Sequence, residues 1–131
     1  MKYLLDTNAF LWHLISPDKL NDAASQIISA ADSQLLLSIA SVWEISIKHG
    51  LGRLQLPTSP AEFVASRIVV MGASLLPIEL RHITALGLLP PHHRDPFDRM
   101  LVAQATADGL QLITSDSLIG AYEVPIVWAA R

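Results

Sequence analysis

The chain has no cysteine, which excludes disulfide bonds and metal sites built from thiolates. It has no apolar run that approaches the roughly 18 residues of a membrane-spanning helix. The apolar start of the chain is interrupted at Asp6, too early for the core of a signal peptide. We therefore expect a soluble, cytoplasmic protein without a membrane segment.

The chain also has no strong excess of charge of either sign. Its net charge is −3, and acids clustered at a metal site can mask a basic surface. Charge alone therefore neither favours nor excludes a nucleic-acid partner.

Hydrophobic residues are abundant, at 51% of the 131 residues. A chain of this length can bury roughly two-thirds of its unfolded surface, so we expect a single domain over residues 1–131. No internal repeat, linker or low-complexity segment divides it. The apolar surplus indicates a sheet covered by helices and a further surface reserved for a partner.

Strand and helix patterns alternate along the chain. Short apolar runs predict strands at residues 2–5, 35–39, 74–78, 110–114 and 124–128, the last at a sheet edge because Pro125 cannot donate to a neighbour. Caps and spacing predict helices at residues 9–14, after Asn21 or Asp22, from Ser41 to Gly50 or Gly52, at 61–71, at 79–86, and from Asp95 and Pro96 to Gly109. This order predicts an α/β fold with a mostly parallel sheet and helices on both faces.

Four acids occupy informative places in this pattern. Asp6 and Asp116 directly follow the first and fourth strands, and Glu44 lies in the first turn of the helix after the second. These three are expected at the carboxyl edge of the sheet, where ligands bind in such folds. Asp98 lies in the first turn of the helix before the fourth strand. From the pattern we expect that helix to begin at the opposite edge, unless it crosses the cleft obliquely.

Each acid also has a structural interpretation, which is the better one when it is taken singly. Asp6 and Asp95 can cap helices, Glu44 can pair with Lys48, and Asp116 can form an Asx turn. Together, however, several carboxylates at one edge repel each other unless cations hold them. Oxygen ligands of this kind suit Mg²⁺ or Mn²⁺ and not zinc.

Four segments of the chain resemble, in order, the motif blocks of PIN-domain ribonucleases, in particular VapC-type toxins of bacterial toxin–antitoxin pairs. They are residues 4–8 (LLDTN), 41–45 (SVWEI), 93–99 (HRDPFDR) and 113–116 (ITSD). The resemblance runs nearly from end to end and includes the last strand. It implies a three-layer α/β/α sandwich with a parallel sheet, in which Asp98 reaches the acidic cleft.

The same resemblance implies the site and its chemistry. Asp6, Glu44, Asp98 and Asp116 carry over as metal-site acids, Thr7 and Thr114 as supporting hydroxyls, and Asp95 as a helix cap. The implied reaction is Mg²⁺-assisted hydrolysis of an RNA phosphodiester by an activated water. Candidate phosphate contacts flank the cleft at Lys48, Arg53, Arg94 and Arg99. Arg99 is equally a candidate partner for a neighbouring acid.

Two neighbouring histidines, His92 and His93, could approach the scissile strand. Adjacent histidines in a polar loop are more often plain surface, and this is the interpretation we favour.

The resemblance also implies partners, namely a homodimer and an antitoxin with an apolar tail. We expect the partner surfaces at residues 61–71, through Phe63, Val64, Ile68 and Val69, and at residues 10–12. Packing of both segments on the domain's own sheet is the alternative.

Two other classes of function stay open. One is a PIN-fold interaction module without activity, which the loss of an acid would have favoured. The other is a different metal-dependent phosphoester hydrolase, which would usually need an acid at the position of Asn8. A dinucleotide-binding fold is disfavoured because no glycine-rich turn follows the first strand.

Overall fold

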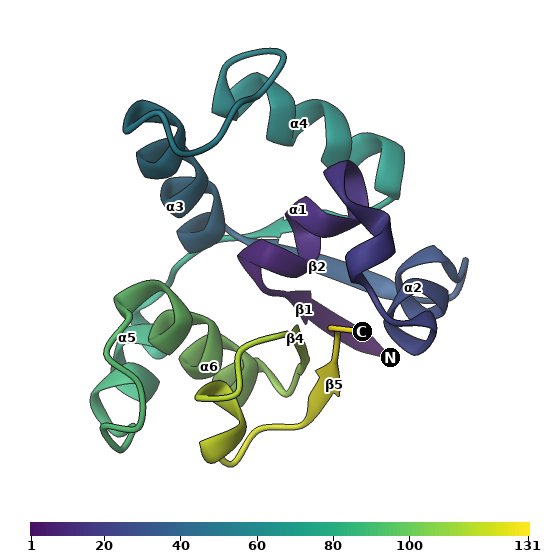
Figure 1. Ribbon diagram of the computed structural model, residues 1–131. Helices are drawn as coiled ribbons and strands as arrows, with labels where there is room; N and C mark the ends of the chain where they lie inside the picture. Colours follow the sequence, from purple (N-terminus) through teal and green to yellow (C-terminus); the bar gives the residue numbers. More distant parts are fainter.

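Five short parallel strands form the centre of the computed structural model, which describes residues 1–131 (Figure 1). The strands lie side by side in the order β3-β2-β1-β4-β5, and every neighbouring pair is parallel. Their bounds are β1 Lys2–Leu5, β2 Gln34–Ser38, β3 Ser74–Leu76, β4 Gln111–Thr114 and β5 Ile126–Trp128. All five predicted strands are therefore confirmed, with β5 at an edge as its proline requires.

Six α-helices connect the strands, together with the 3₁₀ turns η1 (Pro17–Lys19) and η2 (Ile119–Ala121). Their bounds are α1 Thr7–Ile15, α2 Asp22–Ser29, α3 Ile39–Gly50, α4 Pro60–Met71, α5 Leu80–Gly87 and α6 Pro96–Asp108. Asp95 caps α6 as predicted, and of the two candidates for the cap of α2 the structure has Asn21, with Asp22 as the first helical residue. None of these helices has the length and apolar character needed to cross a bilayer.

The prediction that Ser41 caps α3 is wrong. The cap is Ser38, whose hydroxyl accepts a hydrogen bond from the backbone N–H of Ala40 at 3.0 Å. Ser38 is also the last residue of β2, so the chain passes from strand to helix without a loop. Ser41 and Glu44 consequently lie inside the helix, and Glu44 is in its second turn instead of its first.

Alternate strand residues point to opposite faces and form two apolar cores. Leu5, Leu37 and Ile113 pack with α1–α4, while Leu4 and Leu112 pack with α6 and η2. In Figure 1, α1 and α4 lie above β1 and β2, whereas α5 and α6 lie below and to the left of these two strands. The predicted three-layer α/β/α sandwich is confirmed.

Most of the residues expected to form a partner surface are buried in the protein's own core. Phe10, Phe63, Val64 and Ile68 all belong to the core on the α1–α4 side of the sheet. Val69 alone among the four named helix positions is exposed, at 79%. The expectation was therefore wrong for the inner face of α4, because that face covers the sheet.

The direction of α6 corrects the expectation for Asp98. Gly109, in the left-handed conformation with φ 67°, caps the carboxyl end of α6, and β4 begins two residues later. Because β4 runs parallel to β1, it begins at the amino edge of the sheet. A helix that leads into such a strand ends at the amino edge and so begins at the carboxyl edge. Asp98 thus reaches the other acids without an oblique crossing.

Candidate active site

The four predicted acids share one cavity at the carboxyl edge of the sheet. The cavity has a volume of about 160 Å³, and no hydrophobic residue lines it. Its residues are Asp6, Thr7, Asn8, Glu44, Lys48, Asp95, Asp98 and Asp116. Two larger cavities, of about 420 and 470 Å³, each contain a single acid. Of these three cavities, only the small polar one gathers several carboxylates.

Asp6 links β1 to α1 and is almost completely buried, at 4% exposure. Its Oδ1 accepts a hydrogen bond from the backbone N–H of Ala9 at 2.6 Å, so it caps α1. Its Oδ2 accepts one from the Thr114 hydroxyl at 2.7 Å and one from the backbone N–H of Ser115 at 3.3 Å. The predicted cap and the predicted support from Thr114 are both present, and together they fix the carboxylate.

Glu44 projects from α3 into the cavity and is held by two neighbours. The Thr7 hydroxyl donates to Glu44 Oε1 at 2.6 Å and lies 3.0 Å from the Ser41 hydroxyl. Lys48 Nζ lies 3.1 Å from Glu44 Oε2, one turn along the helix, which confirms the predicted pair. Since Lys48 also lines the cavity, this pair is part of the site as well as a helix contact.

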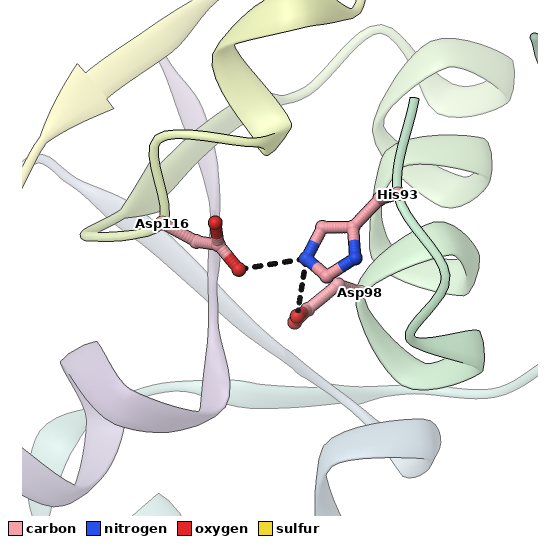
Figure 2. A group of neighbouring side chains, drawn as sticks. All are labelled: His93, Asp98 and Asp116. Atoms are coloured by element: carbon pink, nitrogen blue, oxygen red, sulfur yellow. Dashed lines mark hydrogen bonds and ion pairs between the residues drawn. The ribbon is translucent and has the colours of Figure 1, made fainter. Parts of the chain in front are cut away.

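The Asp98 and Asp116 carboxylates both contact one histidine, His93. Figure 2 shows the His93 ring between the two carboxylates, with a single nitrogen facing both. His93 Nε2 lies 2.7 Å from Asp116 Oδ2 and 3.1 Å from Asp98 Oδ2. Asp116 Oδ1 also accepts from the backbone N–H of Leu118 at 2.9 Å, the predicted Asx turn. The interpretation of His93 as plain surface is therefore wrong, and the only local signal for its place in the site is its closeness in sequence to the acids at the start of α6.

The electrostatics of the cleft reflect burial and the crowding of negative charge. Burial is the largest cause that raises the pKa of Asp6. Burial, followed by the charges of Asp95 and Glu44, raises the pKa of Asp98 to about 7. Asp116 differs: burial, the largest single cause, acts to raise its pKa, but the hydrogen bonds from His93 and from the backbone N–H of Leu118, together with the charge of His93, outweigh burial and lower it. The pKa of His93 is raised, since Asp116 and Asp98 outweigh the opposing effect of its burial.

The basic residues predicted to contact phosphate differ in their positions and in whether their side chains already have partners within the protein. Lys48 lines the cavity, while Arg53 and Arg94 are exposed and form no side-chain hydrogen bond or ion pair. Arg99 is held by the Pro90 carbonyl at 3.0 Å and the Tyr122 hydroxyl at 3.1 Å, so its partner is not an acid. The structure thus gives Arg99 a structural role at the loop before α6.

The other histidine, His92, is not among the residues that line the acidic cavity. Its ring packs edge to face on Tyr122, with 5.0 Å between the ring centroids. The interpretation of His92 as surface agrees with its exposure.

The arrangement has the features of a cation site and none of a covalent nucleophile. Five carboxylates and one ammonium line the cavity. The Thr7 and Thr114 hydroxyls both donate to carboxylates and are 3% and 0% exposed, so neither is free to attack a substrate. Carboxylate oxygens are the ligands that Mg²⁺ and Mn²⁺ prefer.

Comparison with known sequences gives a consistent assignment. The family model described as the PIN domain matches residues 3–123. Ribonuclease VapC22 from Mycobacterium tuberculosis is 30% identical over 125 residues, covering 93% of this chain and 92% of the relative. Ribonuclease VapC16 from the same organism is 34% identical over 68 residues, and this match spans only about half of either protein, 52% of this chain and 48% of the relative.

Comparison with solved structures supports the fold independently. The crystal structure of VapBC2 from Rickettsia felis, bound to a DNA fragment from their promoter, superposes with a TM-score of 0.74. The match covers 98% of this chain and 99% of that chain at 12% sequence identity. At this identity the likeness establishes the fold and leaves the chemistry to the residues of the cleft.

Proposed function

The chain belongs to the PIN domain family, and on this premise we propose that it is a Mg²⁺- or Mn²⁺-dependent endoribonuclease, the toxin of a toxin–antitoxin pair. The observation that carries the proposal is the polar cavity in which Asp6, Glu44, Asp98 and Asp116 meet. RNA as the substrate is supported by the names of the relatives, both of which are ribonucleases.

The residues of the cavity fit a small divalent cation. All five acidic side chains offer hard oxygen ligands, and Lys48 supplies the one opposing ammonium. Burial and then the neighbouring charges of Asp95 and Glu44 raise the pKa of Asp98, and a bound cation would offset both of these causes. When bound, a divalent ion would activate a water molecule and stabilise charge on the phosphorane and the leaving oxygen.

The chain's own residues hold and orient the site. Asp6, Glu44, Asp98 and Asp116 would hold the ion. Thr114 keeps Asp6 in place and Thr7 keeps Glu44 in place, each through a short hydrogen bond. Lys48, Arg53 and Arg94 offer positive charge beside the cleft, which suits contacts to the phosphates of an RNA strand.

RNA cleavage by the purified protein tests this proposal. Cleavage of single-stranded RNA should require Mg²⁺ or Mn²⁺ and stop in EDTA. Asp98→Asn should abolish it at nearly constant side-chain volume, whereas Asp32→Asn, at an exposed turn, should leave it unchanged.

Two experimental outcomes would contradict the assignment as a ribonuclease, and each would favour one of the two other classes of function. If metal-loaded wild-type protein cleaves no RNA, the chain is an interaction module without activity. If it hydrolyses other phosphoesters but not RNA, it is a different metal-dependent hydrolase.

The proposed partner is a small antitoxin whose apolar tail lies along α3. Ile39, Trp43, Ile47 and Leu51 recur every four residues along α3 and its cap, and are 39%, 60%, 40% and 63% exposed. A four-residue spacing places them in one stripe on the helix. The Trp43 ring packs edge to face on Phe97 of α6, one residue before Asp98. The stripe therefore borders the acidic cleft.

A tail on this stripe could place a cation in the cleft. An arginine or lysine there would pair with the carboxylates and compete with the metal ion. Trp43→Ser should therefore weaken the complex with the antitoxin, while Val70→Ser, exposed on α4, should not. Inhibition that is insensitive to Mg²⁺ concentration would contradict competition in the cleft.

We also propose that the protein forms a homodimer. Further apolar side chains are exposed on β3 and α5, at Leu75, Leu80 and Ile83. Light scattering on the purified protein should give twice the mass of the chain, and a monomer at micromolar concentration would contradict this proposal.

A further inference from the structure

His93 forms a bridge between carboxylates that come from distant parts of the chain. Asp98 lies on α6 and Asp116 follows β4, and one ring nitrogen contacts both (Figure 2). The His93 side chain is only 9% exposed. Its backbone N–H donates to the Tyr122 hydroxyl at 2.9 Å, which anchors the loop that carries the ring.

The second ring nitrogen determines what the first can do. His93 Nδ1 accepts a hydrogen bond from the backbone N–H of Asp95 at 3.1 Å, so it carries no proton in this arrangement. In the neutral ring the proton must then lie on Nε2. The nitrogen that faces Asp98 and Asp116 is therefore a hydrogen-bond donor, with no lone pair directed at the cleft.

His93, Asp98 and Asp116 also have the spacing of a metal-ligand group, with donor atoms within 4.8 Å of one another. For His93 to be a ligand, its proton would have to move from Nε2 to Nδ1. Nδ1–H would then face the N–H of Asp95, and two donors would meet without an acceptor. The loop geometry thus disfavours nitrogen ligation.

We propose that His93 is a positioning residue, which aims the Asp98 and Asp116 carboxylates into the cleft by donating Nε2–H to them, and that it is not a ligand of the metal ion. This inference rests on the proposed metal site. A single donor shared by two carboxylates offsets part of their repulsion and limits how far they can separate. Asp116 needs this support most, since its side chain is 31% exposed.

Binding of Mn²⁺, followed by electron paramagnetic resonance, separates positioning from ligation. Glutamine can place a side-chain N–H near the position of His Nε2 but supplies no ring nitrogen. His93→Ala should weaken Mn²⁺ binding by about tenfold, the lower end of the usual effect of removing a group that orients a ligand, while His93→Gln should stay within about threefold of wild type. His92→Gln serves as the matched control and should bind like wild type.

Pulsed measurements on the same samples add a direct signature. The wild-type protein with Mn²⁺ should show no coupling to a directly coordinated nitrogen. A nitrogen coupling that disappears in His93→Gln would overturn the proposal, as would equal losses of affinity in His93→Gln and His93→Ala. Unchanged affinity in His93→Ala would equally refute positioning. Matching thermal melts in EDTA will show that the variants are folded.

The same binding experiment distinguishes failure of the proposed metal site from failure of the proposed role of His93. If wild-type protein does not bind Mn²⁺ at all, the metal site itself is wrong. If it binds Mn²⁺ and the variants behave other than expected, only the role of His93 is wrong.

Discussion

Replacing Asp98 with asparagine should stabilise the metal-free protein, even though it removes a proposed ligand. The pKa of Asp98 is raised from 3.8 to about 7, chiefly by burial and then by the charges of Asp95 and Glu44. Asparagine has nearly the same shape and no charge. Its amide oxygen can still accept from His93 Nε2, which lies 3.1 Å from the present carboxylate.

The magnitude follows from the pKa shift. A shift of about three units corresponds to roughly 4 kcal/mol at 1.36 kcal/mol per unit, as an upper bound. Relaxation of the site and access of water reduce this, and we expect a gain of about 1–2 kcal/mol. For a chain of this length that is a rise in Tm of roughly 4–8 °C.

The pH dependence has a definite sign. Between about pH 4 and pH 7 the folded wild type keeps a proton on Asp98 that the unfolded chain has lost. Raising the pH through this window therefore lowers the stability of the wild type, and Asp98→Asn removes that loss. The advantage of the variant should be absent below about pH 4, grow up to about pH 7 and stay constant above it.

Thermal melts in EDTA at pH 4, 6 and 8 measure this difference, with Asp32→Asn as the control for loss of an exposed acid. If Asp98→Asn melts below wild type at pH 8, or if its advantage does not grow with pH, the charge crowding inferred for the cleft is wrong.

Three further predictions concern the site and the core. Thr7→Val should lower the free energy of unfolding by about 1–3 kcal/mol in urea titrations, because buried Glu44 loses its 2.6 Å hydrogen bond; an unchanged value would refute that role. Mn²⁺ affinity should rise about tenfold from pH 6 to pH 8, as Asp98 with a pKa of about 7 loses its proton, and a flat titration would remove Asp98 from the ligands. Phe10→Ala should cost about 3–5 kcal/mol in the same urea titrations, since Phe10 is fully buried, and a loss below about 1 kcal/mol would place it outside the core.

The features that sequence could predict are those governed by local rules. Asn21 and Asp95 each cap a helix because a short polar side chain can accept from the next N–H groups. Asp6 and Asp116 lie at the carboxyl edge because each follows a parallel strand directly. Neither inference needs knowledge of contacts between distant residues.

The features that could not be predicted from the sequence depend on tertiary contacts, or on which of two nearby residues of equal local propensity is used. Ser38 and Ser41 are both good caps, and only the absence of a loop after β2 decides for Ser38. His93 joins the site through residues at distances of 5 and 23 positions along the chain, which no periodicity reveals. Ile68 and Val69 are neighbours in α4, yet packing on the sheet buries one and leaves the other exposed.

The central claim, that the acids of the cleft hold a divalent cation, is tested most directly by anomalous scattering from a crystal soaked in Mn²⁺. We predict a single region of anomalous density among the carboxylate oxygens of Asp6, Glu44, Asp98 and Asp116, at metal–oxygen distances of about 2.2 Å, with His93 outside bonding distance. Anomalous density bonded to the His93 ring would contradict the positioning role. A cleft without anomalous density at saturating Mn²⁺ would contradict the metal site itself.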